Sequence, residues 1–500
     1  MYSNRTYRIP LRRRPFLCLF LALLFACQAP VAPREKSYAE YKESRYLHLD
    51  AAIQSMKGKL ISYVSDVQTK ANQITQDAFV TDFFKIIMAF QALKGTGQLT
   101  PQAIRNTELL EKKFNEHYIL HYQGFYDILF INPQGDVFFT IRRQNDLQKN
   151  IFNGQLKDTA LSKKMTAAPA ESFVDFQFYE ISGEPSAFFI EPVQDNNGFQ
   201  GWIVLQFAVT KINDLFSQEQ DIGATGEIFL VNREHYMLTD SRFNAESTIL
   251  KEHLPDENIS SKFAAGKGRK EVVDYRGKRV ASSFETFDFL DSRWLIIAKM
   301  DEAEIFTDYF RQYPEKLRQA MDRLNLNQPS GHEPVEFGFD DGLEVDMDEF
   351  RRTDQPRTLY TYGVSTCAAF VLKYPGKFTY LAHISTYDKV YGENRTDLIA
   401  HILKKVEYLE IKAAEKNDLE FCMVSPSRKA FYNMVGRLLE HGYFLSQIRL
   451  MQNPDAAHAN VKSEELGGEV LVNWKMKDNT YYLDRASKNP SLQERLKQAM

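Results

Sequence analysis

The chain of 500 residues is poor in cysteine, in net charge and in long apolar runs. Its 4 cysteines are too few for a disulfide-rich secreted scaffold. Its formal charge of −4 lacks the basic excess that nucleic-acid binding requires, so no nucleic-acid partner is predicted. Gly-x-Ser-x-Gly, His-Glu-x-x-His, Cys-x-x-Cys and P-loop sequences are absent as well. The chain therefore carries none of the common motifs of serine hydrolases, zinc peptidases and nucleotide-binding proteins. We predict neither a cofactor nor a metal.

Residues 1–26 have the composition of a secretory signal. Arginines precede an apolar run that is too short to span a bilayer. The run ends in Leu24-Phe25-Ala26-Cys27, and this ending resembles a bacterial lipobox. The resemblance implies cleavage before Cys27 and a lipid anchor on Cys27. The rest of the chain would then lie in the cell envelope, facing the periplasm or the cell exterior. An ordinary signal peptide and an uncleaved anchor are the alternatives.

A long helix is predicted over 38–93, after a short tether at 27–37. The apolar residues that recur in it at spacings of three and four are Ile53, Met56, Leu60, Val64, Val67, Ala71 and Ile74. Such a stripe packs either on its own domain or on a second copy of the chain, as a coiled coil that would make a homodimer.

Two stretches repeat one pattern of strand, turn and return strand. The first is 124–140, and the second begins at 225–232. Between them, β-branched and aromatic residues predict strands at 173–177, 186–193 and 201–207. Two related antiparallel sheets are therefore expected.

The helix and the two sheets together resemble the extracytoplasmic double Cache sensor domains of bacterial chemoreceptors and histidine kinases. The motifs that carry the resemblance are Tyr126-Asp127-Ile128, Asn132-Pro133-Gln134-Gly135-Asp136, Gly183-Glu184-Pro185 and Thr225-Gly226-Glu227. The resemblance implies a double Cache domain over 38–305, with a long N-terminal helix and two antiparallel PAS-like sheets. It also implies a pocket for a small ligand in the membrane-distal part.

The strands that line this pocket in the family give five candidate ligand residues. These are Asp175, Tyr179, Phe189, Glu191 and Asp195. A purely structural role is the alternative for each of them.

The segment 306–355 is predicted to be a helix followed by an acidic linker. Its acidic residues include Asp340, Asp341, Glu344, Asp346, Asp348 and Glu349. Their spacing lacks the ordered ligand pattern of an EF-hand loop, so a solvated linker is favoured over a calcium site.

Further on, a nucleophile and a base come close together in the sequence. Two strands are predicted at 359–372 and 378–384, with Cys367 in a tight bend and His383 on the second strand. A thiolate can attack a carboxamide, and an imidazole can hold the thiol proton and later give it to the leaving ammonia. The alternatives are a buried structural cysteine and histidine, and a disulfide between Cys367 and Cys422.

This stretch resembles the CheD family of chemoreceptor glutamine deamidases, whose signature is Thr-x-Gly-x-Gly-Ser-Cys followed by a short strand and Ala-His. Thr361, Gly363, Cys367 and His383 fall on matching positions, whereas Ser365 and Thr366 replace a glycine and a serine. By resemblance, Cys367 is the nucleophile, His383 is base and acid, and Thr361 orients the imidazole. The resemblance implies a CheD-like α/β sandwich over 356–480, followed by a tail at 481–500.

The whole chain is thus predicted to be of mixed α+β class, and its hydrophobic content of 44% suffices for the cores of two to three domains. We expect a membrane-anchored lipoprotein that senses a small ligand and hydrolyses glutamine side chains of a protein substrate. The alternative is a non-catalytic signalling lipoprotein whose CheD-like domain only docks a partner protein.

Overall fold

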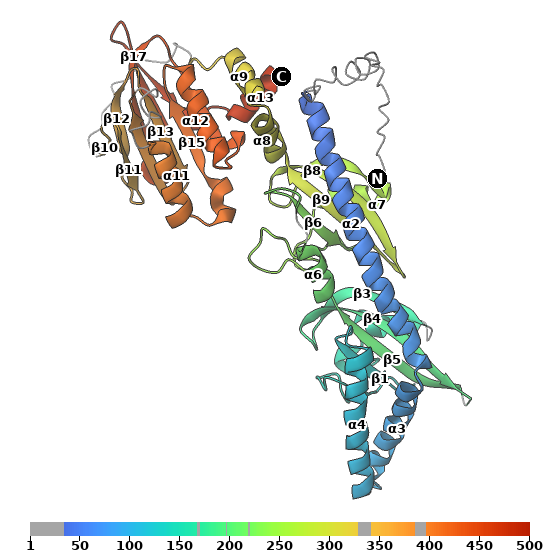
Figure 1. Ribbon diagram of the computed structural model, residues 1–500. Helices are drawn as coiled ribbons and strands as arrows, with labels where there is room; N and C mark the ends of the chain where they lie inside the picture. Colours follow the sequence, from blue (N-terminus) through green and yellow to red (C-terminus); the bar gives the residue numbers. More distant parts are fainter. Residues whose placement is uncertain (1–34, 168–170, 197, 219–220, 329–341, 386–396) are drawn as a thin grey trace, which may run out of the picture.

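The computed structural model describes residues 35–167, 171–196, 198–218, 221–328, 342–385 and 397–500 (Figure 1). The predicted signal peptide, Cys27 and most of the predicted tether lie outside these residues. In chain order, the described part forms a long helix with two antiparallel sheets and then a pair of packed sheets. No helix in this part has both the length and the apolar character needed to cross a bilayer.

The long helix α2, Tyr38–Gln73, runs along the first two sheets (Figure 1). Ser37 caps it, because its hydroxyl accepts the N–H of Glu40 and the Glu40 carboxylate accepts the N–H of Ser37. Its buried residues are Tyr41, Tyr46, Leu49, Ile53, Met56, Leu60, Val64, Val67 and Ala71. The predicted apolar stripe is therefore buried within its own chain.

A helical hairpin follows, made of α3, Ala78–Thr96, and α4, Pro101–His121. Asp77 caps α3 by accepting the N–H groups of its first turn. Gly97, with φ of 71°, ends α3 in the left-handed conformation that glycine adopts without strain. The rings of Phe83 and Phe114 stack between the two helices, with centroids 4.1 Å apart.

The first sheet has the strand order β2-β1-β5-β4-β3 and both of its faces are buried. Its strands are β1 Asp127–Ile131, β2 Val137–Thr140, β3 Ser172–Tyr179, β4 Glu184–Asp195 and β5 Gly198–Ala208. One face packs on the helices α2, α3 and α4, through residues such as Phe130. The other face packs on α5, Ala160–Ala167, through residues such as Leu129. The first sheet with α3, α4 and α5 is called the first module below.

The second sheet has the strand order β6-β9-β8-β7. Its strands are β6 Glu227–Val231, β7 Lys267–Val273, β8 Arg279–Phe289 and β9 Ser292–Asp301. The helix α6, Thr210–Ser217, connects the two sheets, and α7, Asp256–Ala265, covers the face opposite α2. The second sheet with α7 is called the second module. The predicted combination of a long helix with antiparallel sheets is confirmed.

The C-terminal part contains two five-stranded sheets that face each other. Their strand orders are β11-β14-β13-β15-β16 and β10-β12-β17-β18-β19. The strands are β10 Leu343–Glu344, β11 Glu349–Thr353, β12 Leu359–Val364, β13 Ala368–Tyr374, β14 Phe378–Ile384, β15 Glu420–Val424, β16 Ile448–Met451, β17 Ala456–Ser463, β18 Val470–Met476 and β19 Tyr481–Arg485. Apolar residues including Val371, Val461 and Trp474 fill the space between them. The helices α11, Leu398–Leu409, and α12, Arg428–Glu440, cover the outer face of the β11-β14-β13-β15-β16 sheet (Figure 1). This unit is called the C-terminal sandwich.

Two segments differ from their prediction. The acidic linker supplies the strands β10 and β11, which pair with β12 and β14. The segment 481–500 is part of the fold, because β19 pairs with β18 and the helix α13, Leu492–Ala499, buries Leu492 and Leu496 completely. Both segments are rich in charge and short, so their few apolar positions give no clear periodicity in the sequence.

The helices α8, Glu302–Gln312, and α9, Pro314–Arg323, lie between the second module and the C-terminal sandwich. On one side of α8, Asp308 pairs with Arg45 of α2 at 3.1 Å. On the other side, the Arg311 guanidinium donates to the carbonyls of Leu439 and Tyr443 at 3.1 and 2.9 Å. The helix α8 is therefore bonded to both halves of the chain.

Candidate ligand and catalytic sites

A buried polar cluster lies on the face of the first sheet that is turned away from α2. Asp127 on β1 pairs directly with Gln206 on β5, so their side chains share this face. Gln206 donates from Nε2 to Ser186 Oγ at 2.8 Å, and the Tyr179 hydroxyl donates to Asp146 Oδ2 at 3.3 Å. All five side chains are buried. The strand β1 and the loop after β2 thus bring the carboxyl groups of Asp127 and Asp146 close together.

Three acceptor atoms of this cluster have no hydrogen-bond donor within the described residues. They are Asp127 Oδ2, Asp146 Oδ1 and Gln206 Oε1. The other oxygen of Asp127, Oδ1, accepts the backbone N–H groups of Ile128, Ile141 and Arg142 at 2.8, 3.0 and 3.2 Å. Buried acceptors without donors are unfavourable. Such acceptors are satisfied in proteins by ordered water or by a bound group that supplies donors.

The electrostatics of the two carboxyl groups agree with this geometry. Burial raises the pKa of Asp127 to about 6, and the nearby Asp146 contributes to the rise. Burial also raises the pKa of Asp146. A cation placed between them would favour the ionised form of both groups.

Three of the five predicted ligand residues lie on two opposite faces of the first sheet. Phe189 belongs to the apolar cluster on the α2 side. Glu191 follows it by two residues on the same strand and so shares that side. Burial raises the pKa of Glu191 to about 8, with a smaller contribution from Glu171. Tyr179 points to the opposite face, where it belongs to the cluster of Asp127 and Asp146.

The other two predicted ligand residues make structural contacts. Both carboxylate oxygens of Asp175 lie 3.0 Å from the indole N–H of Trp294 on β9, so this contact joins the first module to the second. Asp195 ends β4 and lies 3.4 Å from Lys85 Nζ on α3. The five predicted residues therefore do not converge on one pocket, and Tyr179 alone among them belongs to the polar cluster.

Thr361 and His383 come together between the two sheets of the C-terminal sandwich. Thr361 is on β12 of one sheet and His383 on β14 of the other, and Thr361 Oγ1 lies 2.8 Å from His383 Nδ1. The Thr361 hydroxyl donates to the carbonyl of Val345 at 2.7 Å. Both side chains are buried, at 0% and 3% exposed.

These contacts assign the proton on the imidazole. A hydroxyl has one proton, and because Thr361 donates it to Val345, Thr361 must accept from His383 Nδ1–H. The lone pair then lies on Nε2, which has no hydrogen-bond partner within the described residues. Burial lowers the pKa of His383, against the opposing effect of Asp348 and Asp346. A neutral imidazole whose Nε2 carries a lone pair is the form that accepts a proton from a nucleophile.

Cys367 lies in the same layer between the sheets. It immediately precedes β13, on which Ala369 pairs directly with His383. Side chains two residues apart share a face, so Cys367 is a diagonal neighbour of His383, with a Cα separation of about 7–8 Å expected for this register. The bend before it contains Gly363, which has φ of 70° at a β-bulge of β12. The fold thus brings the three predicted catalytic residues into one layer.

Neither Cys367 nor Cys422 forms a disulfide, so that alternative is wrong. Cys422 is on β15 and pairs with Val371, several residues along the sheet from Cys367. Burial raises the pKa of Cys422 to about 11, which keeps its thiol protonated and unreactive at neutral pH.

In the described residues, one group of potential metal ligands lies together, made of His235, His253 and Asp256. His235 Nδ1 lies 2.6 Å from Asp256 Oδ1, so these two side chains pair with each other directly. The acidic residues at 344–349 do not form such a group.

Sequence reasoning missed Asp127, Asp146, Gln206 and Val345. Asp127 did give a signal, because it is the one charged residue in an otherwise apolar strand. Gln206 and Asp146 gave none, since only the strand register and the loop path place them beside Asp127. The Val345 carbonyl belongs to the segment that was predicted to be a linker.

The family described as Cache domain matches residues 42–309, which is more than half of the chain. No curated protein matches the chain. Solved structures with a similar fold include the ligand-binding domain of the Pseudomonas fluorescens chemoreceptor CtaA in complex with L-serine. It has 12% identity and a TM-score of 0.34, and the match covers 52% of this chain and 99% of that one.

Another similar structure is the sensory domain of the Campylobacter jejuni chemoreceptor Tlp3 with isoleucine bound. It has 10% identity and a TM-score of 0.37, and the match covers 55% of this chain and 99% of that one.

Proposed function

Since the chain belongs to the Cache domain family, we propose that it is an extracytoplasmic sensor whose first module binds a small ligand with a protonated amine. The observation that carries this proposal is the set of three buried acceptors on Asp127, Asp146 and Gln206 that have no donor within the described residues. An ammonium group offers three donors, and its charge offsets the carboxylates. Such a ligand supplies what the cluster lacks.

Thermal unfolding of the full chain in the presence of primary amines and amino acids tests this proposal. A ligand that binds only the folded state raises Tm. We expect the rise in the wild type and in Asp195→Asn, but not in Asp127→Asn. The two variants carry the same substitution at a buried and at a peripheral carboxylate, so they separate the cluster from the surface. Equal rises in all three proteins would refute the amine site.

The N-terminal sequence supports a location outside the cytoplasm. The apolar run at 16–26 and Cys27 together match a lipoprotein signal, so we propose that a lipid on Cys27 anchors the sensor to a membrane. Expression with a radiolabelled fatty acid measures this directly. Label is expected in the wild type and absent from Cys27→Ser, and a chain that incorporates no label would refute the anchor.

A second activity is favoured by the geometry of Thr361 and His383. We propose that the C-terminal sandwich hydrolyses glutamine side chains of a protein partner, as CheD-like proteins do. His383 Nε2 takes the proton of the Cys367 thiol, and the thiolate attacks the carboxamide carbon. The C–N bond then breaks, and ammonia leaves with the proton that His383 returns. Water hydrolyses the resulting thioester, which yields glutamate and restores the thiol.

The alternative is that the C-terminal sandwich only docks a partner protein. Iodoacetamide, which resembles a carboxamide substrate, distinguishes the two. We expect Cys367 of the full chain to be alkylated faster than Cys422, and expect His383→Ala to remove the difference. Cys422 is the internal control, because it is buried in the same layer but pairs with Val371 rather than lying beside His383. Equal, slow labelling of both cysteines would leave the docking role and refute the hydrolase.

A further inference from the structure

The turn after β6 in the second module has the same hydrogen bonds as the turn after β1 in the first module. The N–H of Gly135 donates to the carbonyl of Asn132 at 2.9 Å, and the N–H of His235 donates to the carbonyl of Asn232 at 3.1 Å. In each turn the asparagine side chain also accepts the N–H of the residue that follows, at 2.8 Å. His235 therefore occupies the position that Gly135 occupies in the first module.

The backbone at this position favours glycine. The φ angle is 90° at Gly135 and 65° at His235. Glycine adopts this left-handed conformation freely, whereas a residue with a Cβ atom is strained in it. Strained residues of this kind are concentrated at functional sites. Because glycine satisfies the same turn in the first module, the imidazole of His235 points to a use other than making the turn.

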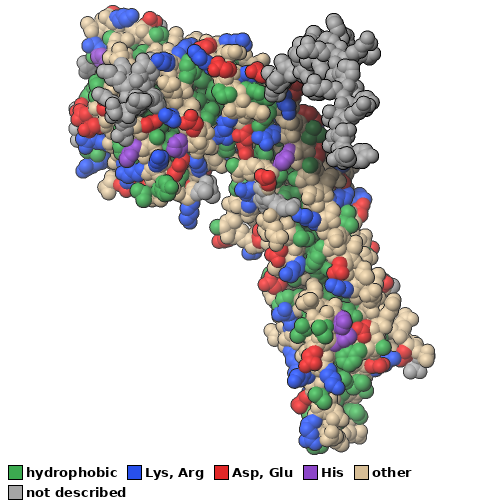
Figure 2. All heavy atoms as spheres, in the orientation of Figure 1, with side chains coloured by type: hydrophobic (Ala, Val, Ile, Leu, Met, Phe, Trp, Pro, Cys, Tyr) green, Lys and Arg blue, Asp and Glu red, His purple; other side chains and the backbone are tan. Residues whose placement is uncertain are grey.

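The imidazole of His235 meets a second histidine and a carboxylate. Its Nδ1 lies 2.6 Å from Asp256 Oδ1, and His253 Nε2 lies 3.7 Å from the same oxygen. The backbone joins these segments, because the N–H of Leu254 donates to the carbonyl of His235 at 2.9 Å. Histidine is scarce in the chain, with 10 among 500 residues, and its side chains are spread over the face shown in Figure 2. A pair of histidines beside one carboxylate therefore stands out.

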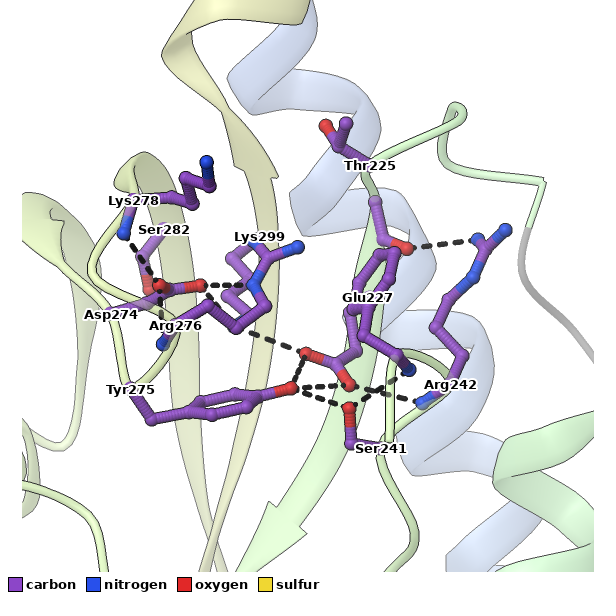
Figure 3. A network of polar contacts seen from close by, with 12 residues as sticks. Thr225, Glu227, Ser241, Arg242, Asp274, Tyr275, Arg276, Lys278, Ser282 and Lys299 are labelled. Carbon is purple, nitrogen blue, oxygen red and sulfur yellow. Dashed lines mark hydrogen bonds and ion pairs between the residues drawn. The ribbon is translucent and has the colours of Figure 1, made fainter. Parts of the chain in front are cut away.

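Other carboxylates of the second module are paired with lysine or arginine (Figure 3). Glu227 and Asp274 both pair with Lys299, at 3.1 and 2.5 Å. Among the described residues, the ion-pair partners of Asp256 are instead the two histidines. A metal ion can therefore bind this carboxylate without displacing a lysine or an arginine.

We propose that His235, His253 and Asp256 bind a zinc ion. Imidazole nitrogen and carboxylate oxygen are zinc ligands, whereas Ca²⁺ and Mg²⁺ prefer oxygen alone. Neighbouring ligand atoms of a tetrahedral zinc site lie about 3.4 Å apart. The separation of His253 and Asp256 is already close to this value, and that of His235 and Asp256 must widen by about 0.8 Å. The side chain of Asp256 is 73% exposed and is free to make this movement.

A further contact suits an imidazole that binds a metal through Nδ1. The proton of His235 is then on Nε2, and Ser260 Oγ lies 3.4 Å from Nε2. Histidines that bind a metal usually donate their other N–H to such an acceptor, which fixes the ring. Zinc would thus tie the turn after β6 to α7, which supplies both Asp256 and Ser260. This site is in the second module and does not depend on the amine site of the first module.

Calorimetric titration of the full chain, free of any histidine tag, with zinc chloride tests this site. We expect the wild type to bind one more zinc ion per chain than His235→Gly. Glycine is the residue that the same turn has in the first module, so this variant keeps the turn. His117→Gln is the matched control and should bind zinc like the wild type. His117 also lies 2.6 Å from an aspartate, Asp77, but is in no group of three ligands within the described residues. Ser260→Ala should weaken zinc binding about tenfold.

Three results would overturn the proposal. These are equal zinc stoichiometry in the wild type and His235→Gly, loss of the zinc ion in His117→Gln, and displacement of zinc by an equal concentration of calcium. Circular dichroism of His235→Gly without zinc shows that its loss of binding is not a loss of fold. Amine binding by His235→Gly should be unchanged, so failure of the zinc site and failure of the first-module site are distinguishable.

Discussion

Replacing Asp127 by asparagine is expected to stabilise the folded chain at pH 7. Burial raises the pKa of Asp127 from 3.8 to about 6. A difference of one pH unit corresponds to about 1.4 kcal/mol, so the ionised carboxylate destabilises the folded state by about 3 kcal/mol. Asparagine keeps an oxygen for the three backbone N–H groups and carries no charge. The substitution therefore removes this cost together with the site for an amine.

The sign of the pH dependence follows from the raised pKa. The folded state holds the proton of Asp127 more tightly than the unfolded state, so the wild type loses stability as the pH rises from about 4 to 6. Asp127→Asn does not lose stability in this way, because asparagine does not titrate. The two proteins should differ by about 3 kcal/mol at pH 7 and by less than about 1 kcal/mol at pH 4.

Urea unfolding of the full chain at both pH values measures the difference. Trp202 on β5 belongs to the same face of the sheet as Asp127 and reports on the first module. Asp136→Asn, at the exposed turn between β1 and β2, is the control and should change stability little at either pH. A variant that is no more stable than the wild type at pH 7 would refute the argument that Asp127 lacks a counter-charge.

Three further outcomes are expected. Lys262→Met should stabilise the chain at pH 7 by about 3 kcal/mol, because burial lowers the pKa of Lys262 from 10.5 to about 8. The unfolded state then holds more protons between pH 8 and 10.5, so wild-type stability should rise across that window, and urea unfolding at pH 7 and 10 should show the gap closing. Thr361→Val should slow alkylation of Cys367 at pH 7 by roughly tenfold, since it removes the acceptor that fixes Nδ1–H. Thr361→Ser should retain the rate, and equal rates in all three proteins would contradict the tautomer assigned to His383. Gly363→Ala should destabilise the C-terminal sandwich by about 1 kcal/mol in urea, because φ is 70° there while the space for a methyl group is open.

Structural elements with a strong hydrophobic periodicity could be predicted from the sequence. The stripe from Ile53 to Ala71 predicted the buried face of α2, since residues three and four apart share one side of a helix. Runs of β-branched and aromatic residues predicted the strands of the first sheet and β6 of the second sheet. The short charged strands β10 and β11 gave no such pattern, because their pairing depends on partners far along the chain.

The proximity of the candidate catalytic residues could be predicted because one sequence motif contains them. Cys367, His383 and Thr361 are close enough in the sequence for their spacing to carry information. The cluster of Asp127, Asp146 and Gln206 is assembled by strand register and by a loop, which no local pattern encodes. Lys262 is one lysine among many in the sequence, and its burial follows only from the packing of its helix, α7, on the second sheet.

The helix α8 has a mechanical consequence for the chain. It is held to α2 through Arg45 and Asp308, and to the C-terminal sandwich through the two bonds of Arg311. A rotation of α8 that keeps these bonds must turn the segment from Leu439 to Tyr443 with it. That segment follows α12, which packs on the sheet that carries His383. A displacement of α8 relative to either half of the molecule must therefore break or carry along at least one of these bonds.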